Sequence, residues 1–142
     1  MNNRLIAIIA FALLPGFLVP FTAHAQAAPK HRVIFQVTDN DPVKWQLTLT
    51  NALNVQMDLG RNNVQIEILA YGPGLPMLNA ESKVADRLAQ ALDNNVELIA
   101  CENTMRTMKV SRDDMYYGIK YVETGVSHLM KRQREGWAYI RP

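Results

Sequence analysis

The sequence has 142 residues, with 15 lysines and arginines against 13 aspartates and glutamates. This near-balance gives no large positive field, which excludes the usual electrostatic basis of nucleic-acid binding, so we expect no nucleic-acid partner. The chain has one cysteine, Cys101. It therefore cannot form an intramolecular disulfide, and its stability has to come from packing within the chain or between subunits.

The first 25 residues have the pattern of a cleavable secretory signal. Arg4 supplies the positive charge, Leu5 to Val19 is an almost unbroken apolar run, and Ala23-His24-Ala25 is an A-x-A cleavage site. The alternative is an anchor that stays in the membrane, but the run is shorter than the ~20 residues that a spanning helix needs. We expect residues 1–25 to be removed and residues 26–142 to form one periplasmic domain without stable membrane insertion.

The first part of this domain has the pattern of alternating strands and helices. Short runs rich in apolar and β-branched residues predict strands at 32–37, 64–70 and 96–100. The middle run alternates apolar with polar residues, as in a half-exposed strand near a sheet edge. Apolar residues at helical spacing predict one helix capped by Asp41-Pro42 and ended by Gly60, and another near 84–94. Such alternation predicts parallel strands joined by right-handed crossovers.

The C-terminal third is less regular but continues this pattern. We expect a short helix at 103–108, a strand at 119–122, a helix at 125–134 and a last strand at 137–140. Three basic residues close the last helix, where cations complement the helix dipole, and we interpret them as a solvated face: Lys131, Arg132 and Arg134. The predicted fold is α/β, with a parallel sheet of about five strands, helices on both faces and a flavodoxin-like βαβ order.

Cys101 is the residue whose chemistry and predicted position agree. It lies at the carboxyl end of a buried strand and just before a helix, where open parallel sheets place their ligand sites. Backbone N–H groups at a helix start favour a thiolate, whereas a nearby Glu102 carboxylate would disfavour it. The alternative is a buried cysteine that acts as a small apolar side chain. Position alone leaves both interpretations open.

Other candidate sites are weaker. Gly72-Pro73-Gly74 follows a strand and could line a cleft, but it lacks a nucleotide-binding glycine pattern and a tight turn explains it as well. Asp39 ends the first strand and could face the same cleft, although residues there also serve helix capping. His31 and His128 are the only histidines after cleavage and have no metal-ligand spacing, so we expect no metal site. The apolar stretch from Met105 to Tyr117 suits a contact surface or ordinary core.

Four segments in this order resemble the small DsrE/DsrF-like (YchN-like) proteins. They are Val33-Ile34-Phe35-Gln36-Val37, Tyr71-Gly72-Pro73-Gly74, Cys101-Glu102-Asn103-Thr104-Met105, and the tail from Gly125 to Pro142. The resemblance spans nearly the whole mature chain. It implies a parallel sheet of about five strands, assembly into trimers or hexamers, and a link to sulfur relay, in which a strand-end cysteine carries sulfur as a persulfide to a partner cysteine.

The resemblance implies a function and a set of site residues. Cys101 corresponds to the persulfide acceptor, and the expected substrate-binding residues around it are Asn103, Thr104, Gly72, Gly74 and Asp39. A sulfur donor or acceptor protein is the expected partner, and no cofactor is expected. The alternative function is a non-catalytic module that keeps the fold and assembles through the Met105 to Tyr117 stretch. Reactivity of the thiol separates the two hypotheses.

Overall fold

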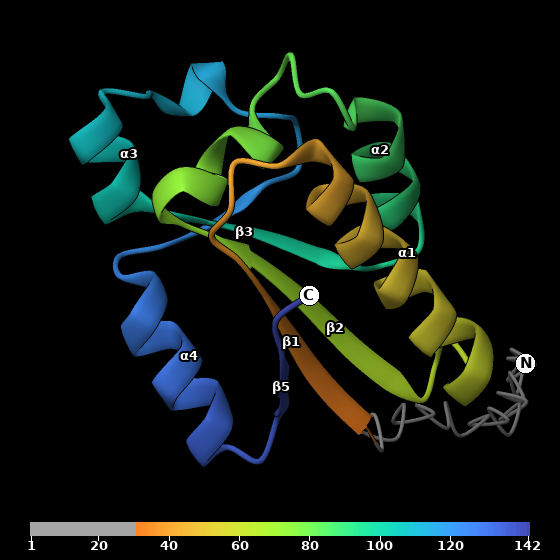
Figure 1. The fold of residues 1–142 in the computed structure, drawn as a ribbon. Helices are drawn as coiled ribbons and strands as arrows, with labels where there is room; N and C mark the ends of the chain where they lie inside the picture. The colour runs from red at the N-terminus through yellow and green to blue at the C-terminus, as the bar shows by residue number, and fades with distance from the viewer. Residues whose placement is uncertain (1–30) are drawn as a thin grey trace, which may run out of the picture.

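The computed structural model describes residues 31–142, so the predicted signal at 1–25 and the predicted start of the domain lie outside the described residues (Figure 1). A five-stranded sheet forms the centre. All pairs of neighbouring strands are parallel, and the order is β4-β3-β2-β1-β5. The strands are β1 (His31–Val37), β2 (Val64–Ala70), β3 (Glu97–Cys101), β4 (Lys120–Val122) and β5 (Ala138–Ile140).

Helices connect these strands. They are α1 (Pro42–Leu59), the 3-10 helix η1 (Gly72–Leu78), α2 (Ala85–Asp93), α3 (Glu102–Met108), the 3-10 turn η2 (Arg112–Asp114) and α4 (Gly125–Arg134). The predicted α/β fold with a parallel sheet of five strands is confirmed. Among residues 31–142, no helix is long and apolar enough to cross a membrane.

The two faces of the sheet are covered by different helices because the chain reverses direction once. From β1 to β4 each strand is added on the same side of the previous one, so right-handed crossovers place α1 and α2 on one face. The chain then returns past the whole sheet to place β5 beside β1. That reversal puts α4 on the opposite face, as Figure 1 shows.

The strand order corrects one detail of the prediction. In a flavodoxin-like order the first strand lies between the second and third, whereas here β2 lies between β1 and β3. The expectation that β2 is half-exposed and near an edge was also wrong. Its position at the centre of the sheet buries six of its seven residues, and Glu67 has no exposed surface.

Each face of the sheet packs a separate apolar cluster. The larger lies under α1 and α2 and includes Phe35, Leu49 and Leu88. The smaller lies under α4 and contains Ile34, Leu69, Ile99, Leu129 and Trp137. Tyr71 and Val122, near the carboxyl ends of β2 and β4, also pack against this second cluster.

Local sequence signals fix the ends of the elements as predicted. The Asp41 carboxylate accepts a hydrogen bond from the Val43 N–H at 2.9 Å, which caps α1, and Pro42 occupies the first helical turn. Gly60 ends the helix with a φ of 87°. The other α-helices and the strands lie within one or two residues of their predicted limits, whereas the 3-10 helices η1 and η2 were not predicted. Cys101 is the last residue of β3 and immediately precedes α3.

A buried ion-pair network joins β2 to α4. Glu67 contacts His128 Nε2 at 2.8 Å and binds Arg132 through both carboxylate oxygens, at 3.0 and 2.5 Å. The Arg132 guanidinium also stacks on Trp137, 4.7 Å from the ring centroid. The interpretation of Arg132 as part of a solvated face was therefore wrong, because its side chain is only 23% exposed and binds the fully buried Glu67 carboxylate.

Candidate functional site around Cys101

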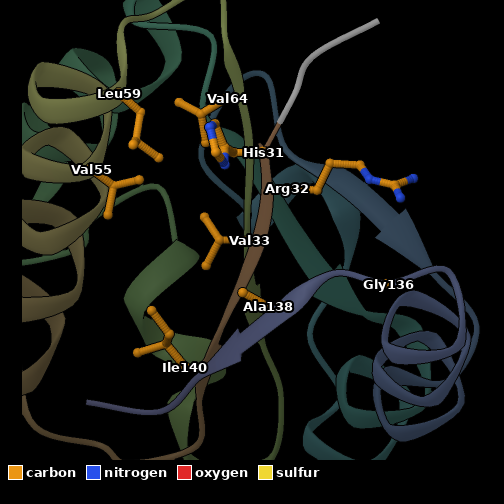
Figure 2. Close-up of a pocket in the computed structure, with 9 residues that line it drawn as sticks. All are labelled: His31, Arg32, Val33, Val55, Leu59, Val64, Gly136, Ala138 and Ile140. Atoms are coloured by element: carbon orange, nitrogen blue, oxygen red, sulfur yellow. The ribbon is translucent and has the colours of Figure 1, made fainter.

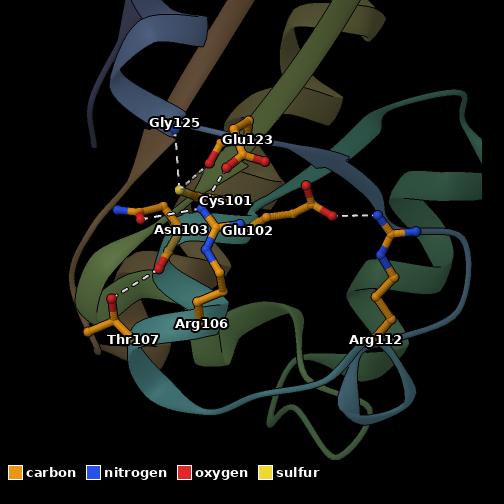
Figure 3. A network of polar contacts seen from close by, with 8 residues as sticks. All are labelled: Cys101, Glu102, Asn103, Arg106, Thr107, Arg112, Glu123 and Gly125. Carbon is orange, nitrogen blue, oxygen red and sulfur yellow. Dashed lines mark hydrogen bonds and ion pairs between the residues drawn. The ribbon is translucent and has the colours of Figure 1, made fainter.

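The Cys101 thiol lies at the carboxyl edge of the sheet between α3 and the start of α4 (Figure 3). Only 3% of the residue is exposed. The Gly125 N–H donates a hydrogen bond to Sγ at 3.3 Å, and the Glu123 carbonyl oxygen lies 3.9 Å from Sγ. The thiol proton thus has a weak acceptor in Glu123, whereas a thiolate has a backbone donor in Gly125.

Hydrogen bonds favour the ionised form of this cysteine. Burial is the largest influence and by itself raises the pKa of Cys101. Donor groups near the sulfur act in the other direction and prevail, so the pKa is lowered: the Thr104 hydroxyl has the largest effect, followed by the backbone N–H groups of Thr104, Gly125 and Asn103. The site therefore combines a buried sulfur with surroundings that make it easier to ionise than an ordinary cysteine.

Thr104 connects the cysteine to the glycine loop. Its hydroxyl oxygen accepts a hydrogen bond from the Gly72 N–H at 3.0 Å, which leaves the hydroxyl proton available for the sulfur. Gly72 has a φ of 53°, in the left-handed region that favours glycine. The structure thus brings together Cys101, Thr104 and Gly72, three of the residues expected from the sequence.

Two other glycines are required for close packing. A Cβ atom on Gly74 would lie 2.4 Å from the Val37 carbonyl oxygen, so this glycine lets η1 approach the end of β1. A Cβ atom on Gly125 would lie 3.1 Å from the Tyr71 ring, which packs over the start of α4. Gly74 is therefore a packing residue that holds the loop in place, and the loop is a 3-10 helix where the sequence suggested a tight turn.

Asn103 and Asp39 take different places. The Asn103 N–H donates to the Glu123 carbonyl at 3.1 Å, beside the sulfur. Asp39 lies at the same edge of the sheet but at the end of β1, two strands from β3. Its carboxylate pairs with Lys44 at 3.1 Å and Arg141 at 3.6 Å, and the hydrogen bond from Lys44 is the main cause of its lowered pKa.

Glu102, the residue after the cysteine, pairs with an arginine and does not contact the thiol among the described hydrogen bonds. Glu102 forms an ion pair with Arg112, and this hydrogen bond is the main cause of the lowered pKa of Glu102. Arg112 also stacks on Tyr121, 4.4 Å from the ring centroid. The carboxylate that was expected to oppose ionisation of the thiol is therefore held by a cation.

Four residues that were not predicted as site residues complete the surroundings of the thiol: Glu123, Gly125, Tyr71 and Arg106. A signal for the first two was available: residues that follow a parallel strand lie beside those that follow its neighbour. A strand at 119–122 was predicted, so the segment after it belongs at the same edge as Cys101. Tyr71 lies close enough to feel the thiolate charge, although its pKa is raised mainly by burial.

Two further observations describe the rest of the surface. Among residues 31–142, no group of three or more histidines, cysteines, aspartates or glutamates is arranged to hold a metal ion. An apolar groove of about 350 Å³ lies between α1 and β5 (Figure 2). Its lining includes His31 and Val64, at the amino ends of β1 and β2, so it lies at the other end of the strands from Cys101.

Solved structures share this architecture. The protein of unknown function MTH1491 from Methanobacterium thermoautotrophicum is 36% identical with a TM-score of 0.75, covering 79% of this chain and 99% of its own. The conserved protein of unknown function BT1422 from Bacteroides thetaiotaomicron is 16% identical, with a TM-score of 0.64 and coverage of 78% and 94%. The ychN protein from E. coli is 11% identical, with a TM-score of 0.65 and coverage of 81% and 100%.

The latter two similarities show the fold alone, and the comparison with curated proteins gave no significant match. The family comparison is more specific. The DsrE/DsrF-like family matches residues 31–142, which is the whole of the described domain including the cysteine, the glycine loop and the C-terminal tail. The chain is therefore a member of the DsrE/DsrF-like family.

Proposed function

We propose that the protein is a periplasmic sulfur carrier in which Cys101 accepts sulfane sulfur as a persulfide. The observation that supports this most is the hydrogen bond that the Gly125 N–H donates to Sγ at 3.3 Å, at a cysteine that is otherwise buried. The lowered pKa of Cys101 agrees with it, since Thr104 and the backbone N–H groups outweigh the effect of burial. A purely structural cysteine has no need of such donors, and the thiolate is the form that attacks sulfur.

The transfer is a displacement at sulfur. The Cys101 thiolate attacks the outer sulfur of a donor R–S–SH, a new S–S bond forms, the donor S–S bond breaks, and R–S⁻ leaves with the electron pair. The products are Cys101–S–SH and R–S⁻, so charge and atoms balance and no external oxidant is needed. A second thiolate removes the sulfur from Cys101 by the same step in reverse.

The backbone around the sulfur suits a carrier. The Gly125 N–H, 3.3 Å from Sγ, is in place to stabilise negative charge on either the thiolate or the persulfide. Burial at 3% exposure shields a bound persulfide from water and oxidants between loading and delivery. Thr104 and Gly72 hold the adjacent loop, and Asn103 fixes the Glu123 carbonyl on the other side.

The cysteine is tested by mass spectrometry of the intact protein after exposure to polysulfide or thiosulfate. The parent should gain one sulfur atom, and Cys101→Ser should gain none. The Ser hydroxyl can keep both the Gly125 donor and the Glu123 acceptor, so the variant should melt near the parent temperature. The carrier hypothesis would be contradicted if the parent gained no sulfur and the variant lost about 1 to 3 kcal/mol of unfolding free energy, the cost of an unpartnered buried hydroxyl.

The periplasmic location rests on the sequence of residues 1–25. Protein recovered from its native host should begin at Gln26 or within a few residues of it, because Ala23-His24-Ala25 is the cleavage site. N-terminal sequencing checks this. Recovery of cytoplasmic protein that retains Met1 would contradict the location without bearing on the thiol chemistry.

A second candidate function is a non-catalytic assembly module. The observation that favours it is the near-complete burial of Cys101, which leaves 3% of the residue exposed. The rate of alkylation by iodoacetamide as a function of pH separates the two functions. Rapid alkylation with a midpoint below that of an ordinary cysteine supports the carrier, and an inert thiol supports the module.

A further inference from the structure

An ion pair stands at the surface beside Cys101 (Figure 3). Arg106 of α3 places Nη2 2.6 Å from Oε1 of Glu123, and the same Nη2 lies 3.5 Å from Oδ1 of Asn103. The backbone carbonyl of Glu123 is the group that lies 3.9 Å from Sγ. The guanidinium and the thiol therefore share a neighbour, because the Glu123 side chain binds the guanidinium and its backbone carbonyl lies beside the sulfur.

This cation is loosely held. The side chains of Arg106 and Glu123 are 57% and 71% exposed, and exposed ion pairs contribute little to stability. Arg112 is exposed to a similar extent, at 64%, but it also stacks on Tyr121, whereas no aromatic ring holds Arg106 among the described contacts. Another anion can therefore replace the Glu123 carboxylate at Arg106 at a low cost in free energy. A residue that binds an incoming anionic ligand requires this property.

The charges of Arg106 and Cys101 influence each other. The hydrogen bond to Glu123 is the main cause of the raised pKa of Arg106, and the Cys101 thiolate contributes in the same direction. Arg106 also lines a cavity of about 250 Å³ with Glu102, Met105 and Val110. It therefore borders open space and, through Glu123, the surroundings of the thiol.

We propose that Arg106 determines the specificity of the site for small anionic sulfane-sulfur donors, such as thiosulfate and inorganic polysulfide, which it draws to Cys101 by releasing Glu123. The inference rests on the proposed carrier function. With thiosulfate, Cys101–S⁻ attacks the outer sulfur, the S–S bond breaks, and sulfite leaves with the electron pair, giving Cys101–S–S⁻ and SO₃²⁻. The total charge is −3 on both sides.

The physical need for a cation follows from these charges. A thiolate and a dianion repel each other, and a guanidinium at their meeting point offsets the repulsion during approach and binds the departing sulfite. A small donor is required because only 3% of Cys101 is exposed. Glu123 occupies the guanidinium when no donor is present, which keeps the neighbourhood of the thiol electrically balanced.

The test compares two alkylating agents of similar size, anionic iodoacetate and neutral iodoacetamide. The ratio of the iodoacetate rate constant to the iodoacetamide rate constant reports the charge that a reagent meets near Cys101. The thiolate fraction affects both rate constants equally and cancels in the ratio, so a merely structural role of Arg106 would not change it. Arg106→Gln should lower the ratio by about threefold or more, Arg106→Lys should largely retain it, and Glu123→Gln should raise it. The rate of persulfide formation from thiosulfate should follow the same order.

Arg134→Gln is the control for net charge, since Arg134 is exposed at the far end of α4 from Gly125, about 13 Å along the helix. It should leave the ratio unchanged. An unchanged ratio in Arg106→Gln, or an equal fall in Arg134→Gln, would overturn this inference even if the parent accepts sulfur. Failure of the parent to accept sulfur from any donor would overturn the proposed function and this inference with it.

Discussion

At the scale of single residues, Cys101 shows how a side chain can be buried and still have a lowered pKa. Burial disfavours the thiolate, and a sulfur in an apolar pocket without donors would have a raised pKa. Here three segments meet at the sulfur: the end of β3, the first turn of α3 and the start of α4. Together they supply more hydrogen-bond donors than the end of a single strand would. The convergence depends on the fold more than on any one residue.

Removal of the Thr104 hydroxyl should weaken this preference. In Thr104→Val the side-chain donor is lost while the shape is kept, so the pKa of Cys101 should rise and the alkylation profile should move to higher pH. The Gly72 N–H also loses its acceptor, which should cost about 1 to 3 kcal/mol of stability. Iodoacetamide kinetics from pH 5 to 10 and denaturant unfolding measure the two effects.

Thr107→Val is the matched control for that experiment. Thr107 lies one turn further along α3, and its hydroxyl donates to the Asn103 carbonyl at 3.0 Å instead of to the sulfur (Figure 3). Its alkylation profile should coincide with that of the parent. A parent-like profile in Thr104→Val would show that the backbone donors suffice and that the hydroxyl has no part in activating the thiol.

At the scale of elements, Glu67 holds α4 against the sheet through its contacts with His128 and Arg132. This carboxylate is fully buried at the centre of the sheet. Desolvation is the largest single influence and raises its pKa, but hydrogen bonds from His128 and Arg132 together outweigh it, so the pKa is lowered. A helix that covers its face of the sheet alone gains an anchor from this contact. Since Gly125 begins the same helix, the anchor also steadies a donor to the thiol.

Loss of the Glu67 carboxylate should loosen α4. Glu67→Leu leaves the partly buried Arg132 without its main partner, and unfolding should become easier by about 2 to 4 kcal/mol. Adding Arg132→Met should recover much of this loss, because an apolar pair replaces an ion pair. Denaturant unfolding of the two single variants and the double variant measures the coupling, and strictly additive losses would contradict it.

Acid should have the same effect as the substitution. The pKa of Glu67 is lower in the folded chain than in the unfolded chain, so the unfolded state binds the proton more readily. The stabilisation is therefore complete above the unfolded value of about 4.3 and is lost as the pH falls through the folded value. The difference in unfolding free energy between the parent and Glu67→Gln should shrink progressively below about pH 4.3.

The elements themselves could be predicted because their signals are local. The Asp41-Pro42 cap, the Gly60 stop and the apolar run before Cys101 each act within a few residues, and each predicted a boundary correctly. The partners of Glu67 could not be predicted in this way. A polar residue that alternates with apolar ones has the pattern of a solvent-facing position, and only the placement of α4, set by the reversal before β5, supplies a buried cation opposite it.

The candidate site was predictable to the same extent. The rule for parallel sheets placed Cys101, and a resemblance between sequences drew attention to Thr104 and Gly72. The rule for parallel sheets also places the Glu123 backbone beside Cys101, but it does not predict that the Glu123 side chain pairs with Arg106. That contact depends on the distance between α3 and the end of β4, which the sequence does not encode locally.

At the scale of the whole molecule, exposed apolar side chains favour self-association. The Met105 to Tyr117 stretch was expected to contribute, and the structure divides it: Met105 and Met115 are buried in the core, while Met108 and Tyr117 are exposed at 41% and 84%. A contact surface on this stretch therefore reduces to the exposed pair. We propose that the protein assembles into the trimer or hexamer that the family resemblance implies.

Light scattering of the mature protein at micromolar concentration should show an oligomer. Met108→Glu combined with Tyr117→Glu should shift it toward the monomer, because charge at an apolar contact is costly to bury. Met57→Glu is the control, since Met57 is exposed at 82% on α1, away from this stretch. A clean monomer in the parent would contradict the proposed assembly, and an unaffected oligomer in the double variant would place the interface elsewhere.

The return of the chain to place β5 beside β1 has a consequence for the order of folding. Tyr139 binds Gln36 at 2.6 Å across 103 residues, so the outer edge of the first strand stays unpaired until the last residues are available. Pairings of such long range form slowly, and an open strand edge invites pairing with another chain. Chains that lack their last five residues should therefore aggregate during refolding even though every helix is present.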